Sequence, residues 1–236
     1  STTGSPLPSF HAARSTQKTL SSNRNNFERR FAIKIDKQNT SNVANFFDIV
    51  NKEKPNFIKT TQDIASQFGR EYIYREKGLP SIMRKLKRKE SRTLGKINDI
   101  HGSEILVLEK EIPSVIKYAK DNFDIINVDD FSANPTFLGY RGVHLDYQMP
   151  TGMKGEIQIH TKNGIYQKEF AHPIYDKWRN YIESTKKDDF FNILKKIPEK
   201  ERSTFFADID KSWDIYQGIE PIPKSIQKTV NKQIKK

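Results

Sequence analysis

Two segments near the middle of the chain alternate polar and apolar residues with a period of two, and this pattern restricts the fold more than any other feature. The first covers residues 139–148 and the second residues 155–161, with Pro150-Thr151-Gly152 between them. Alternate side chains of an extended strand point to opposite faces. The pattern therefore predicts a β-hairpin with one apolar face in the core and one polar face.

The polar face of this hairpin would carry side chains suited to chemistry. They are Glu156, Gln158 and His160 from the second segment and His144, Asp146 and Gln148 from the first, with Tyr140 and Arg141 just before it. An aromatic ring, cations and carboxylates on one surface suit a nucleobase, phosphates and a metal ion. On pattern alone, a half-solvated antiparallel sheet without any function explains the alternation equally well.

The rest of the chain alternates helical and extended patterns, which predicts an α/β (α+β) fold with a mixed sheet flanked by helices. Strands are expected at 71–77, 104–108 and 124–128, and a helix at 112–123. Two helices are expected between residues 41 and 68, separated by Pro55, and two further helices between 190 and 217. Pro80 is well placed to start a helix whose core face is Ile82, Met83 and Leu86.

Composition divides the chain into three parts. Residues 1–40 are rich in Ser, Thr and Asn and are expected to be flexible or linker-like, although a helical patch at 27–35 could pack on the next domain. Residues 41–185 are expected to form one catalytic domain. Residues 186–236 are expected to add C-terminal helices and a proline-broken basic tail from residue 221.

Charge favours polyanionic partners, since the 236 residues carry a formal net charge of +12. The basic residues are dense between residues 85 and 96, at Lys85, Lys87, Arg88, Lys89, Arg92 and Lys96. Such density suits an anion, although a solvated helix face or a nonspecific RNA patch would look the same. The chain has no cysteine, which excludes disulfides and thiolate metal sites. No apolar run approaches the roughly 18 residues of a membrane helix, so no membrane partner is expected.

Four motifs in a fixed order resemble those of the RelA/SpoT-type nucleotide pyrophosphokinases, the alarmone synthetases. They are the stretch from Tyr74 to Leu86, Ile97-Asn98-Asp99-Ile100-His101-Gly102, the run Gly139-Tyr140-Arg141-Gly142-Val143-His144, and Glu156-Ile157-Gln158-Ile159-His160-Thr161. The resemblance covers about residues 69–181 and implies a nucleotidyltransferase-like synthetase fold.

The resemblance also implies roles for individual residues. Asp99 and Glu156 would be catalytic and would hold Mg²⁺, whereas Asp99 taken alone is more typical of a turn. The ATP-binding residues would be Arg75, Lys77, Arg84 and Lys85. The acceptor-binding residues would be Tyr140, Arg141, His144, Gln158 and His160. Further along, Glu169 and His172 fall where the family has a helix that closes the site.

The activity implied by the resemblance is transfer of the β,γ-pyrophosphate of ATP to the 3′-hydroxyl of a guanosine or adenosine nucleotide. The products would be AMP and a (p)ppGpp- or ppApp-type nucleotide. Two alternatives stay open, namely pyrophosphorylation of the tRNA 3′ end and a non-catalytic RNA-binding module. No His-Asp dipeptide of a hydrolase domain is present. This absence suggests a growth-inhibiting toxin that acts in the cytoplasm, is delivered from another cell, and is matched by a cognate antitoxin or immunity protein.

Three positions depart from the family pattern and leave the acceptor undecided. Glu104 stands where the family has arginine, and His160 also replaces an arginine. Gly142 stands where a hydroxyl residue is common.

Overall fold

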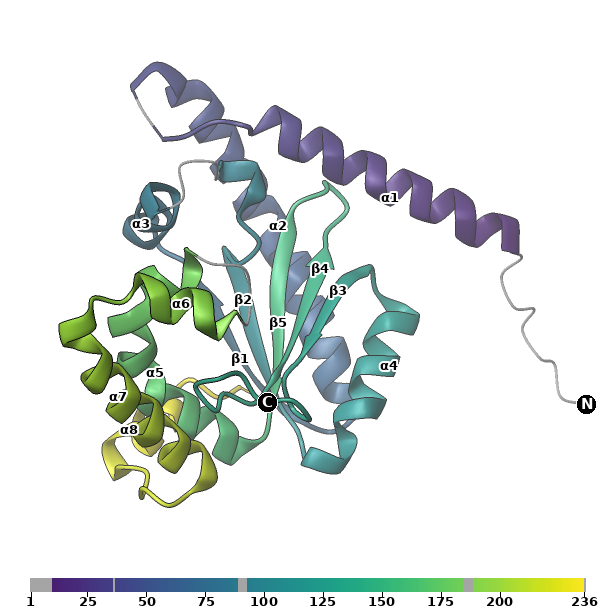
Figure 1. Ribbon diagram of the computed structural model, residues 1–236. Coiled ribbons are helices and arrows are strands. Elements are labelled where there is room, and N and C mark those ends of the chain that lie inside the picture. The colour runs from purple at the N-terminus through teal and green to yellow at the C-terminus, as the bar shows by residue number, and fades with distance from the viewer. Residues whose placement is uncertain (1–9, 36, 89–92, 185–188, 236) are drawn as a thin grey trace, which may run out of the picture.

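A mixed five-stranded sheet forms the centre of the molecule (Figure 1). The computed structural model describes residues 10–35, 37–88, 93–184 and 189–235. The strands are β1 (Glu71–Glu76), β2 (His101–Leu106), β3 (Ile125–Asp130), β4 (Val143–Gln148) and β5 (Lys154–His160), in the order β1-β2-β5-β4-β3. β2 and β5 are parallel and the other neighbouring pairs are antiparallel. This arrangement confirms the expected fold class.

The predicted hairpin is formed by β4 and β5. Its register places His144 opposite Gln158 and Asp146 opposite Glu156. The apolar side chains that alternate with them are fully buried in the main core, namely Val143, Leu145, Ile157 and Ile159. One face of the hairpin is therefore core and the other is polar, as the alternation predicted.

Among the helices that contribute to the main core are α1 (Phe10–Arg30), α2 (Thr40–Gln67) and α4 (Ile112–Asn122). From α2, Phe46 and Phe57 are fully buried. Phe27 near the end of α1 and Phe31 just after it are buried in the same core, and their rings lie 5.0 Å apart. The helical patch expected at 27–35 thus ends at Arg30, and this part of the N-terminal segment packs on the domain.

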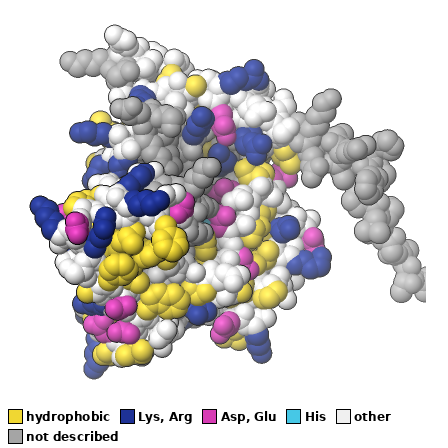
Figure 2. Space-filling model, viewed as in Figure 1, with side chains coloured by type: hydrophobic (Ala, Val, Ile, Leu, Met, Phe, Trp, Pro, Cys, Tyr) yellow, Lys and Arg dark blue, Asp and Glu magenta, His cyan; other side chains and the backbone are white. Residues whose placement is uncertain are grey.

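Helices that follow the hairpin cover part of the opposite face of the sheet. They are α5 (Lys162–Glu183), α6 (Phe190–Lys196), α7 (Glu199–Gln217) and α8 (Lys224–Asn231). Ile73 of β1 packs in a second small core with Ile165 of α5 and Val230 of α8. The tail expected to be irregular therefore contains a helix. Figure 2 shows apolar side chains gathered over α6 and α7, where Phe191 is 74% exposed.

The remaining described helical elements are short. They are α3 (Leu79–Arg88) and the 3₁₀ turns η1 (Lys37–Asn39), η2 (Leu94–Lys96) and η3 (Glu109–Glu111). The helix expected from Pro80 is confirmed as α3, but the expectation that Met83 lies in its core face is wrong. Ile82 and Leu86 are four residues apart and share the buried face, whereas Met83 is rotated away from it and is half-exposed.

The two helices expected between residues 41 and 68 are one continuous helix, α2, with Pro55 inside it. Proline lacks the N–H that would bond to the carbonyl of Asn51. Pro55 is exposed, so water can satisfy that carbonyl, while the buried face of α2 packs on both sides of the proline. Tertiary packing therefore outweighs the local helix-breaking tendency.

Pro55→Ala should restore the missing backbone hydrogen bond and raise the free energy of unfolding by about 1–2 kcal/mol. Phe57→Ala, two residues away on the buried face, should lower it by about 3–5 kcal/mol because it leaves a cavity. Urea denaturation of both variants measures these changes. A loss of stability in Pro55→Ala would contradict the prediction.

Candidate functional site

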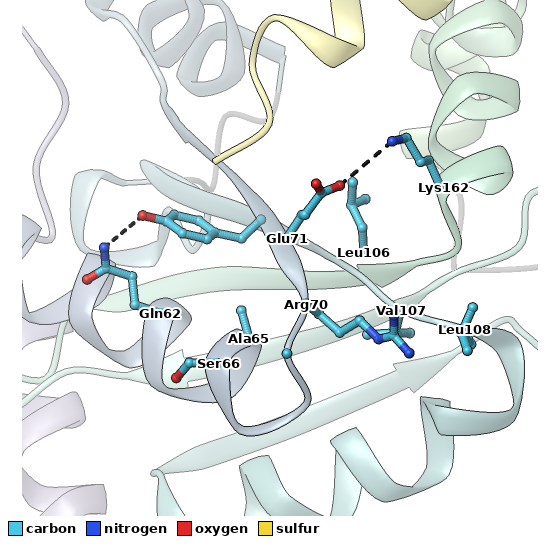
Figure 3. A pocket seen from close by; sticks show the side chains of 11 residues that line it. Gln62, Ala65, Ser66, Arg70, Glu71, Leu106, Val107, Leu108 and Lys162 are labelled. Atoms are coloured by element: carbon cyan, nitrogen blue, oxygen red, sulfur yellow. Dashed lines mark hydrogen bonds and ion pairs between the residues drawn. The ribbon is translucent and has the colours of Figure 1, made fainter. Parts of the chain in front are cut away.

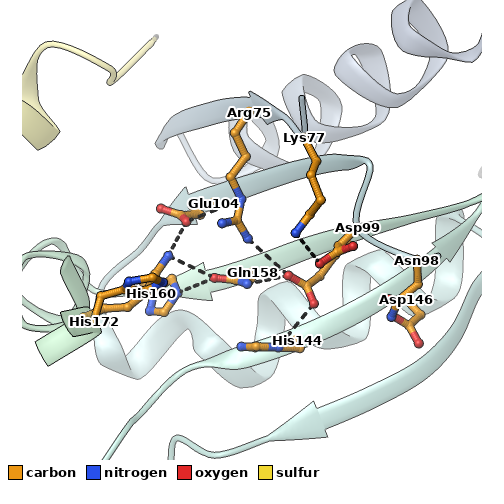
Figure 4. A network of polar contacts seen from close by, with 12 residues as sticks. Arg75, Lys77, Asn98, Asp99, Glu104, His144, Asp146, Gln158, His160 and His172 are labelled. Atoms are coloured by element: carbon orange, nitrogen blue, oxygen red, sulfur yellow. Dashed lines mark hydrogen bonds and ion pairs between the residues drawn. The ribbon is translucent and has the colours of Figure 1, made fainter. Parts of the chain in front are cut away.

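Charged side chains gather on the sheet face opposite the main core, and a glycine lets two of them meet. Arg75 of β1 neighbours Gly102 of β2, and Gly102 neighbours Glu156 of β5. Arg75 crosses above Gly102, and its Nη2 lies 3.2 Å from Oε2 of Glu156 (Figure 4). A Cβ at residue 102 would lie 2.8 Å from Nε of Arg75. The missing side chain of Gly102 therefore makes room for the Arg75–Glu156 ion pair.

Asp99, in the segment before β2, is the second carboxylate of the site. Its Oδ2 lies 2.9 Å from Nζ of Lys77, and its Oδ1 lies 2.7 Å from Nζ of Lys85. Burial raises the pKa of the Asp99 carboxyl, but the two lysines outweigh this effect and hold the pKa below its ordinary value. Asp99 is therefore ionised at neutral pH.

Glu156 is also ionised at neutral pH. Its Oε1 lies 3.5 Å from Nδ1 of His144, and its Oε2 accepts a hydrogen bond from Nε2 of Gln158. Burial raises the pKa of the Glu156 carboxyl, whereas His144, Arg75 and Gln158 lower it, and the net shift is strongly downward. Glu156 is thus held as a carboxylate from three directions.

The carboxylate oxygens of Asp99 and Glu156 suit a Mg²⁺ ion. Mg²⁺ prefers oxygen ligands, keeps several waters and is usually bound through one or two carboxylates together with substrate phosphates. The described residues contain no group of three or more His, Cys, Asp or Glu side chains placed to hold a metal ion. Phosphate and water oxygens would therefore have to complete the octahedron around an ion held by these two carboxylates.

Tyr140, His144 and His160 form an aromatic cluster beside Glu156. The Tyr140 hydroxyl oxygen lies 2.6 Å from Nε2 of His144 and 3.4 Å from Nε2 of His160. A Cβ at Gly142 would lie 2.5 Å from the Tyr140 hydroxyl oxygen and 2.7 Å from Cε1 of His160. Two departures from the family pattern are thus coupled, because the ring of His160 fits against a residue 142 without a side chain.

Two predicted site residues are not in contact with this network. Arg84 is exposed on α3, and its Nη2 donates to Oγ of Ser81 one turn earlier. Arg141 is exposed, and its Nη1 donates to the carbonyl oxygen of Ser132. Lys89 and Arg92 of the basic stretch lie outside the described residues.

The helix expected to close the site is α5, but the two residues singled out on it make local contacts. His172 is exposed, and its Nδ1 lies 3.1 Å from Oδ2 of Asp176 on the same helix. Glu169 is also exposed, and its Oε1 lies 3.6 Å from Nζ of Lys168. His172 is therefore part of a surface ion pair, while Glu169 lies beside the buried Lys168.

Two residues beside this network, Lys168 and Asn98, were not assigned a role from the sequence. Lys168 of α5 is buried and forms an ion pair with the buried Glu104 of β2. Asn98 donates a hydrogen bond of 2.9 Å to Asp146. A lysine on an amphipathic helix is ordinarily exposed, so the sequence carries no signal that Lys168 is buried.

A cavity of about 720 Å³ lies at the other end of β1 and β2 (Figure 3). Its lining includes Arg70, Glu71, Leu106 and Lys162, and none of the predicted site residues. The charges that line it are paired, Arg70 with Glu111 and Lys162 with Glu71. The charged sheet face remains the better candidate for an anionic substrate.

Cations on one face of a sheet can bind phosphate groups, and neighbouring carboxylates can hold a metal ion that phosphates also bind. Residues 74–180 match the family model described as "Region found in RelA / SpoT proteins". This match supports an alarmone synthetase domain of the RelA/SpoT type in this part of the chain.

The chain is also similar to individual proteins. GTP pyrophosphokinase YwaC of Bacillus subtilis (strain 168) is 32% identical over 123 residues, which cover 46% of this chain and 59% of YwaC. The Type VI effector Tas1, solved with its immunity protein, is 19% identical with a TM-score of 0.56 and covers 75% of this chain and 95% of that chain. Small alarmone synthetase 2 from Bacillus subtilis is 20% identical with a TM-score of 0.47 and covers 82% and 96%.

The helices in the described part of the chain are each too short or too polar to span a lipid bilayer.

His160 should make folding stability depend on pH. Burial holds the pKa of its imidazole well below the ordinary value, so the folded protein resists a proton that the unfolded chain accepts. The stability that this provides is present above the unfolded pKa of about 6.5 and is lost as pH falls, by up to about 1.4 kcal/mol per pH unit. Urea denaturation between pH 7 and pH 5 should show a weaker dependence in His160→Asn. The exposed His172→Asn serves as control, and an equal slope in all three proteins would contradict the prediction.

Proposed function

We propose that this protein is a nucleotide 3′-pyrophosphokinase that transfers the β,γ-pyrophosphate of ATP to the 3′-hydroxyl of a guanosine nucleotide, or alternatively of an adenosine nucleotide. The products would be AMP and a (p)ppGpp- or ppApp-type nucleotide. The observation that carries the proposal is the pairing of Arg75, Lys77 and Lys85 with two ionised carboxylates, Glu156 and Asp99, on one sheet face. The RelA/SpoT domain over the same residues supports it.

ATP binding would exchange the partners of these charges. The phosphates of ATP attract Arg75, Lys77 and Lys85, which are now held by the carboxylates. The carboxylates released by this exchange become available to Mg²⁺, which when bound neutralises charge on the ATP oxygens. The exchange keeps each charge paired, so the site would accept Mg²⁺ and ATP together without leaving a buried charge alone.

The acceptor would bind beside β4 and β5. Tyr140 offers an aromatic ring for the acceptor base, and the exposed Arg141 can turn toward its phosphates. His144, Gln158 and His160 line the same side of Glu156. The acceptor 3′-oxygen would attack the β-phosphorus, the bond from that phosphorus to the α,β-bridging oxygen would break, and AMP would leave.

Glu156 could act as the base that accepts the proton of the 3′-hydroxyl only after Arg75 has moved. With Arg75 and His144 beside it, the pKa of Glu156 is too low for efficient proton acceptance near neutral pH. Movement of Arg75 to the ATP phosphates would remove one cause of the low pKa. Glu156 would then orient the hydroxyl and accept its proton.

The shared fold with the effector Tas1 motivates a physiological extension of this proposal. The chain would act as a toxin in the cytoplasm of a target cell, where it would consume ATP, and a cognate immunity protein would block it. Growth arrest on intracellular expression, absent in Glu156→Gln, would support this extension. Growth arrest that persists in Glu156→Gln would contradict it and would favour the non-catalytic alternative.

Incubation of the purified protein with γ-labelled ATP and Mg²⁺ tests the activity, with GDP, GTP, AMP, ADP, ATP and deacylated tRNA offered separately as acceptors. Label should move to a guanosine or adenosine nucleotide. Glu156→Gln keeps the shape of the side chain but removes its charge, and should lower transfer by about 100-fold or more. Label on tRNA would favour the tRNA alternative, and no transfer to any acceptor would contradict the proposal.

Gly102→Ala should displace Arg75, because the new methyl group occupies the path of its side chain. Loss of one charge-assisted contact to ATP should raise KM for ATP about tenfold. Gly78→Ala is the matched control, because a Cβ at Gly78 meets only Cδ of Pro80, at 3.8 Å, and should leave KM unchanged. Initial rates of label transfer measure both, and an unchanged KM in Gly102→Ala would exclude a role of Arg75 in ATP binding.

A further inference from the structure

Lys168 is an unexpected buried cation next to the candidate site. It lies on α5, which packs against the charged face of the sheet, and is 9% exposed. Its Nζ contacts Oε1 of Glu104 on β2 and lies 3.2 Å from Oε1 of Gln158 on β5. A single side chain from the helix thus contacts two neighbouring strands of the sheet.

These contacts close a ring of five side chains. Lys168 binds Glu104, whose Oε1 lies 3.9 Å from Nε of Arg75. Arg75 in turn contacts Glu156, and Glu156 accepts a hydrogen bond from Gln158. Gln158 contacts Lys168, which closes the ring (Figure 4). Glu156 is therefore supported on two sides, by Arg75 and by Gln158, and both supports lead to the Lys168–Glu104 pair.

The charge of Lys168 determines the orientation of the Gln158 amide. Oε1 of Gln158 faces the Lys168 ammonium and Nε2 of His160, at 3.2 Å each, while its Nε2 donates to Glu156. A flipped amide would place its NH₂ group against the ammonium and its oxygen against the Glu156 carboxylate. Both contacts would be repulsive, so Lys168 excludes the flipped orientation.

We propose that Lys168 is a positioning residue, which holds the Gln158 amide so that Glu156 stays in place when Arg75 moves to the phosphates of ATP. This inference rests on the proposed function. The Lys168–Gln158 contact does not include Arg75, so ATP binding would leave it intact. The Glu104–Lys168 pair also explains the acidic residue at position 104, because the buried lysine needs a buried counter-charge.

The test compares kcat and KM for ATP in the wild type, Lys168→Met, Gln158→Met and the double variant of these two residues. Lys168→Met should lower kcat by about 10- to 100-fold, since a small misplacement of a catalytic group has effects of this size. KM for ATP should change less than about threefold, because Lys168 does not contact the ATP cations. The double variant should be no slower than Gln158→Met, because Lys168 acts through Gln158. If the loss of kcat in the double variant equals the product of the losses in the two single variants, the two residues act independently and the proposal is overturned.

A second variant separates positioning from a purely structural role. Glu104→Leu combined with Lys168→Met replaces the buried pair with apolar side chains, a change that is often neutral or stabilising. Lys168→Met alone should lower Tm, because it leaves the buried Glu104 without its cation. In the double variant, Tm should return toward that of the wild type while kcat stays low. Recovery of kcat together with Tm would show that the pair only holds α5 on the sheet. Lys162→Met, which removes an exposed lysine from the same helix, should leave kcat unchanged.

A measurement without substrate keeps the inference distinct from the proposed function. The side-chain amide signals of Gln158 in ¹H–¹⁵N NMR spectra are assigned by their loss in Gln158→Met. In the wild type, one amide proton should exchange slowly because it is bonded to Glu156, and Lys168→Met should make it exchange faster. Unchanged exchange would overturn the positioning role. Absence of label transfer in the wild type would instead contradict the pyrophosphokinase, whatever the NMR result.

Discussion

The balance between three cations and two carboxylates on one face of the sheet is the constraint on which the site depends. Arg75, Lys77 and Lys85 come from β1, the turn after it and α3, whereas Asp99 and Glu156 come from the segment before β2 and from β5. No two of the five are close neighbours in the sequence except Arg75 and Lys77. The sheet and the packing of α3 bring them together. The charges that a nucleotide and its metal ion would contact are therefore already in place in the folded protein.

The alternation of side chains along the strands makes this arrangement compatible with stability. Ser103 and Ile105 of β2 face α2, where Ser103 shares a hydrogen bond with Thr61, while Gly102 and Glu104 face the site. Alternate residues of each strand thus face the core and the site. A shift of one residue in strand register would exchange the two sets, so the deeply packed core also fixes the registration of the charged groups.

Much of this could be predicted from the sequence, because the informative signals are local. The period-two pattern predicted the hairpin, and motif order singled out Arg75, Lys77, Asp99 and Glu156, which form two ion pairs in the structure. Two features that the sequence did not reveal have a common physical cause. The continuity of α2 through Pro55 and the burial of Lys168 depend on contacts with segments far away in the chain. No pattern within a short window shows that a lysine will meet a glutamate sixty-four residues earlier.

The end of the chain has a consequence for how the molecule can associate. β1 is an edge strand of the sheet, and edge strands expose backbone groups that can pair with other chains. Backbone hydrogen bonds join Tyr72 and Lys235 in both directions, at 2.9 Å and 2.7 Å, and α8 packs beside them. The C-terminal segment thus pairs with this edge at one residue, as an isolated β-bridge. Another chain could pair with β1 at Tyr72 only after Lys235 has detached, so the tail covers this part of the edge.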